Sequence, residues 1–98
     1  MMTMCIPEDR LSDLRRILTD VAVTVTEEVG TRDMVEHGHI ADFMCRSERG
    51  VVTIVRCQRV PGIPGVLVRI HTIGGFWKKV FGGHDDLAAK IRDALTAV

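Results

Sequence analysis

The chain has 98 residues, of which 46% are hydrophobic and 27% are charged. This composition is typical of a folded domain and excludes a disordered segment. Thirteen basic and thirteen acidic side chains give a net charge of zero at pH 7, which argues against a protein that binds nucleic acid through bulk positive charge. At this length we expect one domain, spanning residues 1–98.

The first residues have neither the cationic start nor the long apolar stretch of a secretory signal. Cys5, Cys45 and Cys57 are an odd number of cysteines without close spacing. Such thiols are typical of a reducing compartment. The sequence therefore predicts a cytoplasmic protein with free thiols, with a Cys45–Cys57 bridge as the alternative.

The N-terminal third predicts a helix followed by a strand. Pro7 and the acidic pair after it mark a helix start, and the apolar residues that follow have helical spacing, which predicts a helix over 7–19. From Asp20 the period changes to two, because Val21, Val23 and Val25 alternate with smaller or polar residues. Residues 29–38 fit either a short helical turn that ends at Gly38 or an irregular loop.

Three further strands and a helix complete the chain. Strands are predicted over 39–46, 51–60 and 66–73, and a last helix begins near Asp85. In the first of these strands, Ile40, Asp42 and Met44 share one face, and His39 falls on the other with Ala41, Phe43 and Cys45.

This order, α-β-β-β-β-α, predicts an α+β fold. Short connections favour antiparallel neighbours, so we expect a four-stranded antiparallel meander with the N- and C-terminal helices packed on one face. The alternative arrangement places one helix on each face of the sheet.

The turn at Val60-Pro61-Gly62-Ile63 provides a register for the last two strands. Proline suits the second position of a type II turn and glycine the third. Centring the hairpin on this turn pairs Arg59 with Pro64 and Cys57 with Val66. The same register sets Val55 opposite Val68, Thr53 opposite Ile70, Arg56 opposite Leu67, Ile54 opposite Arg69, and Val52 opposite His71.

This register separates two faces. One is apolar and suits the helices, whereas the reverse face mixes aliphatic side chains with Arg56, Arg69 and His71. Two helices rarely cover both faces of a sheet, so we expect the rest of the reverse face to be covered either by residues 76–81 folded back over it or by another protein chain. Arg56, Arg69 and His71 could form a small anion-binding cluster there; the alternative is that Glu27, Asp42 or Glu48 neutralises the arginines.

Residues 74–83 are a second candidate region. Phe76, Trp77 and Phe81 are three of the four aromatic residues, Lys78 and Lys79 lie among them, and a glycine pair stands at each end. These aromatics either fill the core, anchor a protein interface or stack on nucleic-acid bases.

Catalytic and metal-binding motifs are weak. His37, His39 and Cys45 lack the two close ligand pairs of a zinc site. Cys57 is expected to face the core, and Ser47 lies in a turn without a nucleophile elbow. We therefore expect neither an enzyme nor a metal or other cofactor.

The hypothesis from sequence is a small non-enzymatic binding module. Its partner is another protein, or a second copy in a homodimer, and the mechanism is burial of an apolar surface that carries arginines. The alternative is a nucleic-acid-binding accessory protein, and no membrane partner is expected. The predicted contact residues are Ile54, Arg56, Leu67, Arg69, His71, Ile73, Phe76, Trp77, Lys78 and Lys79.

Overall fold

A computed structural model of the chain describes residues 2–29, 32–73 and 87–97. Its elements are strands β1 (Met2–Ile6), β2 (Thr24–Val29), β3 (His39–Arg46), β4 (Val52–Gln58) and β5 (Val66–Ile73), the 3-10 helix η1 (Glu8–Asp13), and helices α1 (Leu14–Val21), α2 (Arg32–Glu36) and α4 (Leu87–Thr96). The α+β fold predicted from sequence is confirmed.

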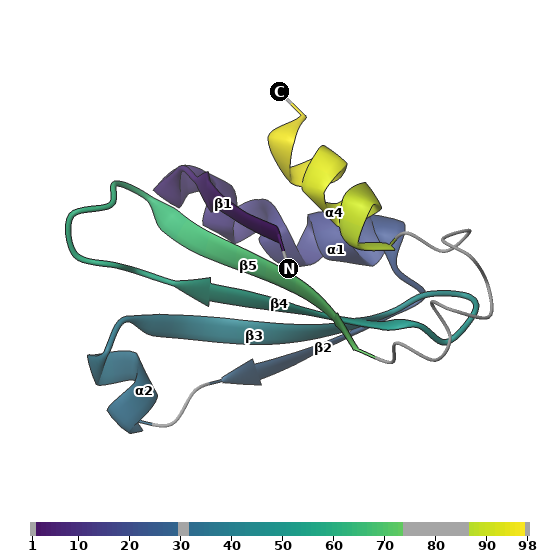
Figure 1. Cartoon of the computed structure of the whole chain (residues 1–98), viewed down its shortest axis with the longest axis horizontal. Helices are drawn as coiled ribbons and strands as arrows, with labels where there is room; N and C mark the ends of the chain where they lie inside the picture. The colour runs from purple at the N-terminus through teal and green to yellow at the C-terminus, as the bar shows by residue number, and fades with distance from the viewer. Residues whose placement is uncertain (1, 30–31, 74–86, 98) are drawn as a thin grey trace.

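The strands form one antiparallel sheet in the order β1-β5-β4-β3-β2. β2 to β5 are the predicted meander, and β1 adds a fifth strand beside β5 (Figure 1). Because β1 and β2 occupy opposite edges, the chain between them must cross the whole sheet. η1 and α1 make this crossing.

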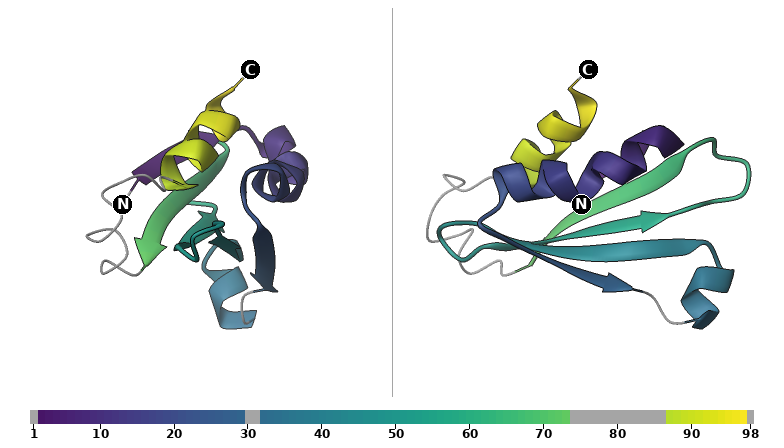
Figure 2. Two further views of the ribbon diagram at one scale, coloured as in Figure 1. Left: turned by 90° about the vertical axis from the view of Figure 1, so that its right-hand side faces the viewer. Right: turned by 180° about the vertical axis from the view of Figure 1, so that it is seen from behind.

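Both long helices pack on the same side of the sheet (Figures 1 and 2). Leu14, Leu18 and Ile91 are fully buried there, and they belong to a single apolar cluster with the side chains that the strands point toward the helices. We call this side the helix face. The expected placement of both helices on one face is thus confirmed, and the alternative with one helix on each face is wrong.

The predicted count of four strands is wrong because residues 2–6 form a strand as well. Met2, Met4 and Ile6 point to the helix face, where Ile6 is buried, whereas Thr3 and Cys5 point away from it. This two-residue period is present in the sequence, but such a short run is stable only because it pairs with β5.

Two predicted boundaries near α1 also change. The helical segment spans Glu8–Val21 instead of 7–19, and its first turns are 3-10 helix. Val21 therefore ends the helix instead of starting a strand, and Val23, with 61% of its surface exposed, precedes β2. For residues 29–38 the helical alternative is the observed one, since α2 forms and Gly38 follows it with a φ of +90°.

A β-bulge shifts the start of β3. His39 pairs with Gln58 and Ala41 pairs with the adjacent Cys57, so β3 contains one extra residue, Ile40, relative to β4. The bulge moves His39 to the same side as Asp42, and its Nε2 lies 3.8 Å from the Asp42 carboxylate. The prediction that His39 shares a face with Ala41, Phe43 and Cys45 is therefore wrong. The prediction that Ile40 shares a face with Asp42 and Met44 is wrong as well, because Ile40 packs against the core on the helix face; from Ala41 to Cys45 the alternation is as predicted.

The β4–β5 register is two residues away from the predicted one. The turn itself forms as expected: Ile63 N donates to Val60 O at 3.1 Å and Gly62 has a φ of +84°. However, the connection continues through Pro64 and Gly65, so Arg56 pairs with Arg69, Ile54 with His71, and Val52 with Ile73. The predicted pairs are wrong, but a shift of two residues leaves every side chain on its predicted face.

We expect Val55→Asp to unfold the domain. Val55 is fully buried on the helix face; losing its burial costs about 1.5–3 kcal/mol, and an unpaired buried carboxylate costs several kcal/mol more. The total approaches the roughly 5–15 kcal/mol by which domains are stable. Ile54→Asp is the matched control, because Ile54 precedes Val55 in β4 and its side chain points to the opposite face of the sheet. Circular dichroism melts should show Ile54→Asp folded; equal melting of both variants would contradict the assigned faces.

Gly65 sets how closely β1 approaches the end of the β4–β5 connection. A Cβ at this position would collide with the carbonyl oxygen of Ile6, whereas a Cβ at Gly62 would meet nothing within 4 Å. Both glycines have nearly the same positive φ, so each alanine variant should lose about 1–2 kcal/mol from backbone strain. Gly65→Ala should lose clearly more than Gly62→Ala in denaturant titrations, and equal losses would be evidence against this close approach.

Candidate functional site

The side of the sheet opposite the helices carries the predicted contact residues. Six of them lie together on β4 and β5: Ile54, Arg56, Leu67, Arg69, His71 and Ile73. β3 adds Asp42, Met44 and Arg46, and β2 adds Thr24, Thr26 and Glu28. We call this surface the open face. The remaining predicted residues, Phe76, Trp77, Lys78 and Lys79, lie outside the described residues.

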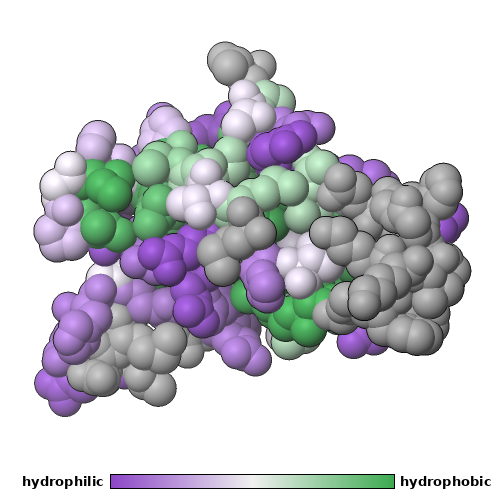
Figure 3. Space-filling view, viewed as in Figure 1, coloured by the Kyte–Doolittle hydropathy of each residue, from purple (hydrophilic) through white to green (hydrophobic). Residues whose placement is uncertain are grey.

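Apolar groups on the open face are partly accessible to water. Ile73 exposes 49% of its surface and Met44 exposes 39%. Ile54 and Val52 are half-buried, and Leu67 is buried with 8% exposed. In Figure 3, hydrophobic surface lies over the central strands beside hydrophilic groups. The accessible apolar area is therefore centred on Ile54, Met44 and Ile73, and Leu67 contributes little to it.

A charged row crosses the open face. Arg69 on β5 lies opposite Arg56 on β4, Arg56 lies opposite Asp42 on β3, and Asp42 lies opposite Glu28 on β2. Directly opposed residues are near neighbours. The two basic residues thus occupy one half of the row and the two acidic residues the other half.

The two central charges neutralise each other. Arg56 donates from Nε to Asp42 Oδ1 at 3.1 Å and from a terminal nitrogen to Asp42 Oδ2 at 3.3 Å. This bidentate contact raises the pKa of Arg56 above its ordinary value, because the carboxylate stabilises the charged guanidinium. Of the acids proposed from sequence, Asp42 is the one that pairs with Arg56. A shared anion site at Arg56 and Arg69 is correspondingly less favoured.

The outer charges have no such partner. Across the part of the chain that the structure describes, neither Arg69 nor Glu28 forms an ion pair or side-chain hydrogen bond. Glu27, the neighbour of Glu28, points to the helix face and pairs with Arg15 of α1. Both outer side chains are exposed, so they can meet charges on another molecule.

Asp42, Met44 and Glu28 were not among the contact residues predicted from sequence. The alternation of β3 already placed Asp42 and Met44 on one face, but only the β3–β4 register joins that face to Ile54 and Arg56. No register was predicted for these two strands, because the connection at 47–51 has no turn type as specific as that at Pro61-Gly62.

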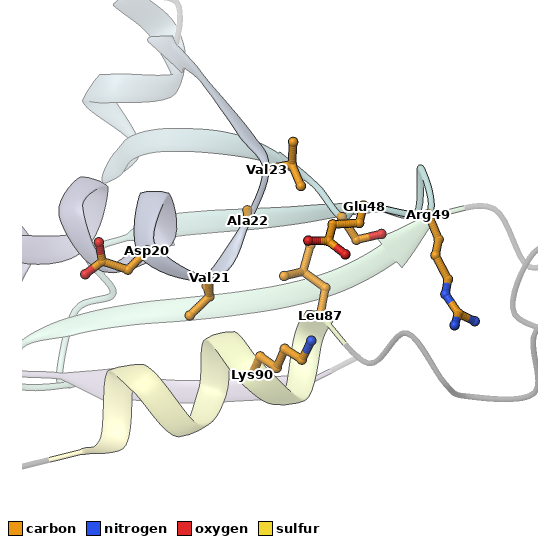
Figure 4. Close-up of a pocket in the computed structure, with 9 residues that line it drawn as sticks. Asp20, Val21, Ala22, Val23, Glu48, Arg49, Leu87 and Lys90 are labelled. Atoms are coloured by element: carbon orange, nitrogen blue, oxygen red, sulfur yellow. The ribbon is translucent and has the colours of Figure 1, made fainter.

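A hollow of about 360 Å³ lies at one end of the molecule, away from the open face. It is formed by the α1–β2 connection, the β3–β4 turn and the start of α4, and is lined by Asp20, Val21, Ala22, Val23, Ser47, Glu48, Arg49, Leu87 and Lys90. Asp20 and Arg49 point outward from opposite ends of this group (Figure 4). Its charges are of mixed sign and do not converge on one point, so we assign it no ligand.

Within residues 2–29, 32–73 and 87–97, no group of three histidine, cysteine or acidic side chains is arranged to hold a metal ion. The helices of the same residues include none with the length and hydrophobicity needed to span a membrane. Comparison with protein-family models, with curated proteins and with solved structures found no match.

The three cysteines differ in burial. All three are free thiols, so the Cys45–Cys57 bridge is absent, and only Cys5 is exposed. Burial raises the pKa of Cys45 to about 11 and, with a smaller contribution from nearby acids, that of Cys57 to about 12. Because the thiolate is the nucleophile, both buried thiols are poorly suited to catalysis.

We expect a thiol reagent such as dithionitrobenzoate to react quickly with one cysteine of the native protein and with the other two only after denaturation. Cys5→Ser should remove the fast reaction of the native protein and leave the reaction of the other two thiols after denaturation unchanged. Rapid reaction of two or three thiols at mildly alkaline pH would contradict the burial of Cys45 and Cys57. The release of the coloured thiolate measures both phases.

Proposed function

We propose that the protein is a small non-enzymatic binding module and that the open face is its protein–protein interface. One observation carries the proposal: α1 and α4 both pack on the helix face, while Ile54, Met44 and Ile73 remain accessible on the other. Apolar surface bordered by arginine is a common composition for the centre of an interface. The free thiols support a reducing compartment such as the cytoplasm as its place of action.

The acidic half of the charged row favours a protein partner over a nucleic acid. Asp42 and Glu28 lie on the same surface as Arg69, and Asp42 already pairs with Arg56. A polyanion laid along this row would be repelled at the exposed Glu28, because Asp42 is neutralised by Arg56; Arg46, in the row of Val52, is a further cation on the open face. The nucleic-acid alternative keeps its candidate residues Arg56, Arg69, Lys78 and Lys79, and salt dependence separates the two proposals.

The proposal is tested with immobilised wild-type protein and two variants. Ile54→Asp places a charge in the centre of the open face, and Val35→Asp places the same charge on α2, where Val35 is 51% exposed. A protein partner should be retained by the wild type and Val35→Asp at high as well as low salt, and at least tenfold less by Ile54→Asp.

Two outcomes would contradict the proposal. Equal retention by all three immobilised proteins would exclude the open face as the interface. Retention that nuclease abolishes, and that falls steeply with added salt, would support nucleic-acid binding instead. Circular dichroism of Ile54→Asp must show a native spectrum, so that loss of binding is not loss of folding.

A further inference from the structure

The order of charges across the open face is self-complementary. Reading from β5 to β2, the row is Arg69, Arg56, Asp42 and Glu28, which is two positive charges followed by two negative ones. A row of this kind matches its own copy when the copy is turned end for end. In a row of alternating charges, each residue would have neighbours of opposite sign within its own chain, so less charge would be available to a partner.

We infer that the partner of the open face is a second copy of this chain, packed face to face about a two-fold axis that runs parallel to the strands between β3 and β4. This inference rests on the proposed function and identifies its partner. The axis exchanges β4 with β3 and β5 with β2. Arg69 of each copy then faces Glu28 of the other, and Arg56 faces Asp42. Such an isologous contact forms a closed dimer.

The neighbouring apolar residues fit the same axis. Ile54 on β4 lies opposite Met44 on β3, so the two-fold places Ile54 of one copy over Met44 of the other on both sides of the axis. His71 meets Thr26 in the same row, since these residues flank Ile54 and Met44 on β5 and β2. Ile54 and Met44 are thereby covered by apolar groups. In the next row the same axis places Val52 over Arg46 and Ile73 over Thr24 of the other copy, and sheets packed in this way remain roughly aligned.

A two-fold axis across the strands is less compatible with the charges. If it passes through the charged row, Arg69 meets Arg69 and Glu28 meets Glu28, so like charges oppose each other. If it passes through the row of Ile54, the charged row of one copy lies over the row of Val52 and Ile73 in the other copy. The guanidinium of Arg69 then lies over Ile73. Only the axis parallel to the strands supplies both outer charges with partners.

The central ion pairs do not obstruct this packing. Arg56 and Asp42 keep their bidentate contact within each chain, so neither charge becomes unpaired when the second sheet covers it. The outer pairs, Arg69 with Glu28 of the other copy, decide the orientation. Four strands of about seven residues give a flat footprint of roughly 450 Å² for each copy, which is small for a permanent dimer. We therefore expect association that depends on concentration.

The experiment uses the full chain and exchanges the outer charges. Wild-type protein should sediment with a mass that rises with concentration from 10.9 kDa toward twice that value. Arg69→Glu alone and Glu28→Arg alone each place like charges at both outer contacts, so each should weaken association at least tenfold. An equimolar mixture of the two variants restores opposite charges at both contacts and should form the heterodimer, seen by native mass spectrometry.

The controls distinguish this inference from the proposed function. Arg16→Glu changes an exposed charge on α1 and should dimerise as the wild type does. A wild-type chain that stays monomeric up to about 1 mM, a dimer insensitive to both single exchanges, or a mixture that fails to associate would overturn the inference. If the immobilised wild type then retains another protein that Ile54→Asp loses, the second copy is excluded as partner while the open face remains the interface.

Discussion

The structure depends on the chain crossing the sheet between its two edge strands. β1 pairs with β5 at one edge, and the chain must reach β2 at the other. η1 and α1 make this crossing on the helix face, and α4 packs beside α1 on the same side. Five strands about 4.8 Å apart span roughly 19 Å between the edges, which is the width of two adjacent helices. Covering one face therefore uses both long helices, and neither is left for the other face.

The side chains of the open face differ from those of a sheet surface that only contacts water. Such a surface usually carries polar residues, yet here Ile54 lies between Met44 and His71. Like charges also stand directly opposite, Arg56 with Arg69 and Asp42 with Glu28. Each such pair is unfavourable within a single chain, and opposite charges on a bound partner would offset that cost. Contacts within a single chain therefore do not account for this order of charges.

The alternation of apolar and polar residues allowed much of the fold to be predicted, because it assigns residues to faces of the sheet without knowledge of which strands pair. The bounds of β3 and β5 were predicted correctly, and Thr53, Val55 and Cys57 are buried as expected. Features that depend on contacts distant in sequence were missed: β1 is stabilised by β5, and the bulge at Ile40 moves His39. The site was predicted only in part for the same reason. Arg56 and Arg69 lie on β4 and β5, where alternation alone assigns each residue to a face. The acidic half of the row is recognised only when the register of β2 and β3 is known.

The charge order on the open face also limits which partners fit it. A surface of one sign would attract any opposite polyelectrolyte, whereas a row divided into halves attracts at one end and repels at the other. A good partner must therefore present the reverse division at the spacing of neighbouring strands. Another antiparallel sheet satisfies the spacing, and this chain's own sheet satisfies both the spacing and the order. In the proposed dimer, the neighbouring like charges of each copy would gain opposite charges in one orientation only, and this would make the contact specific.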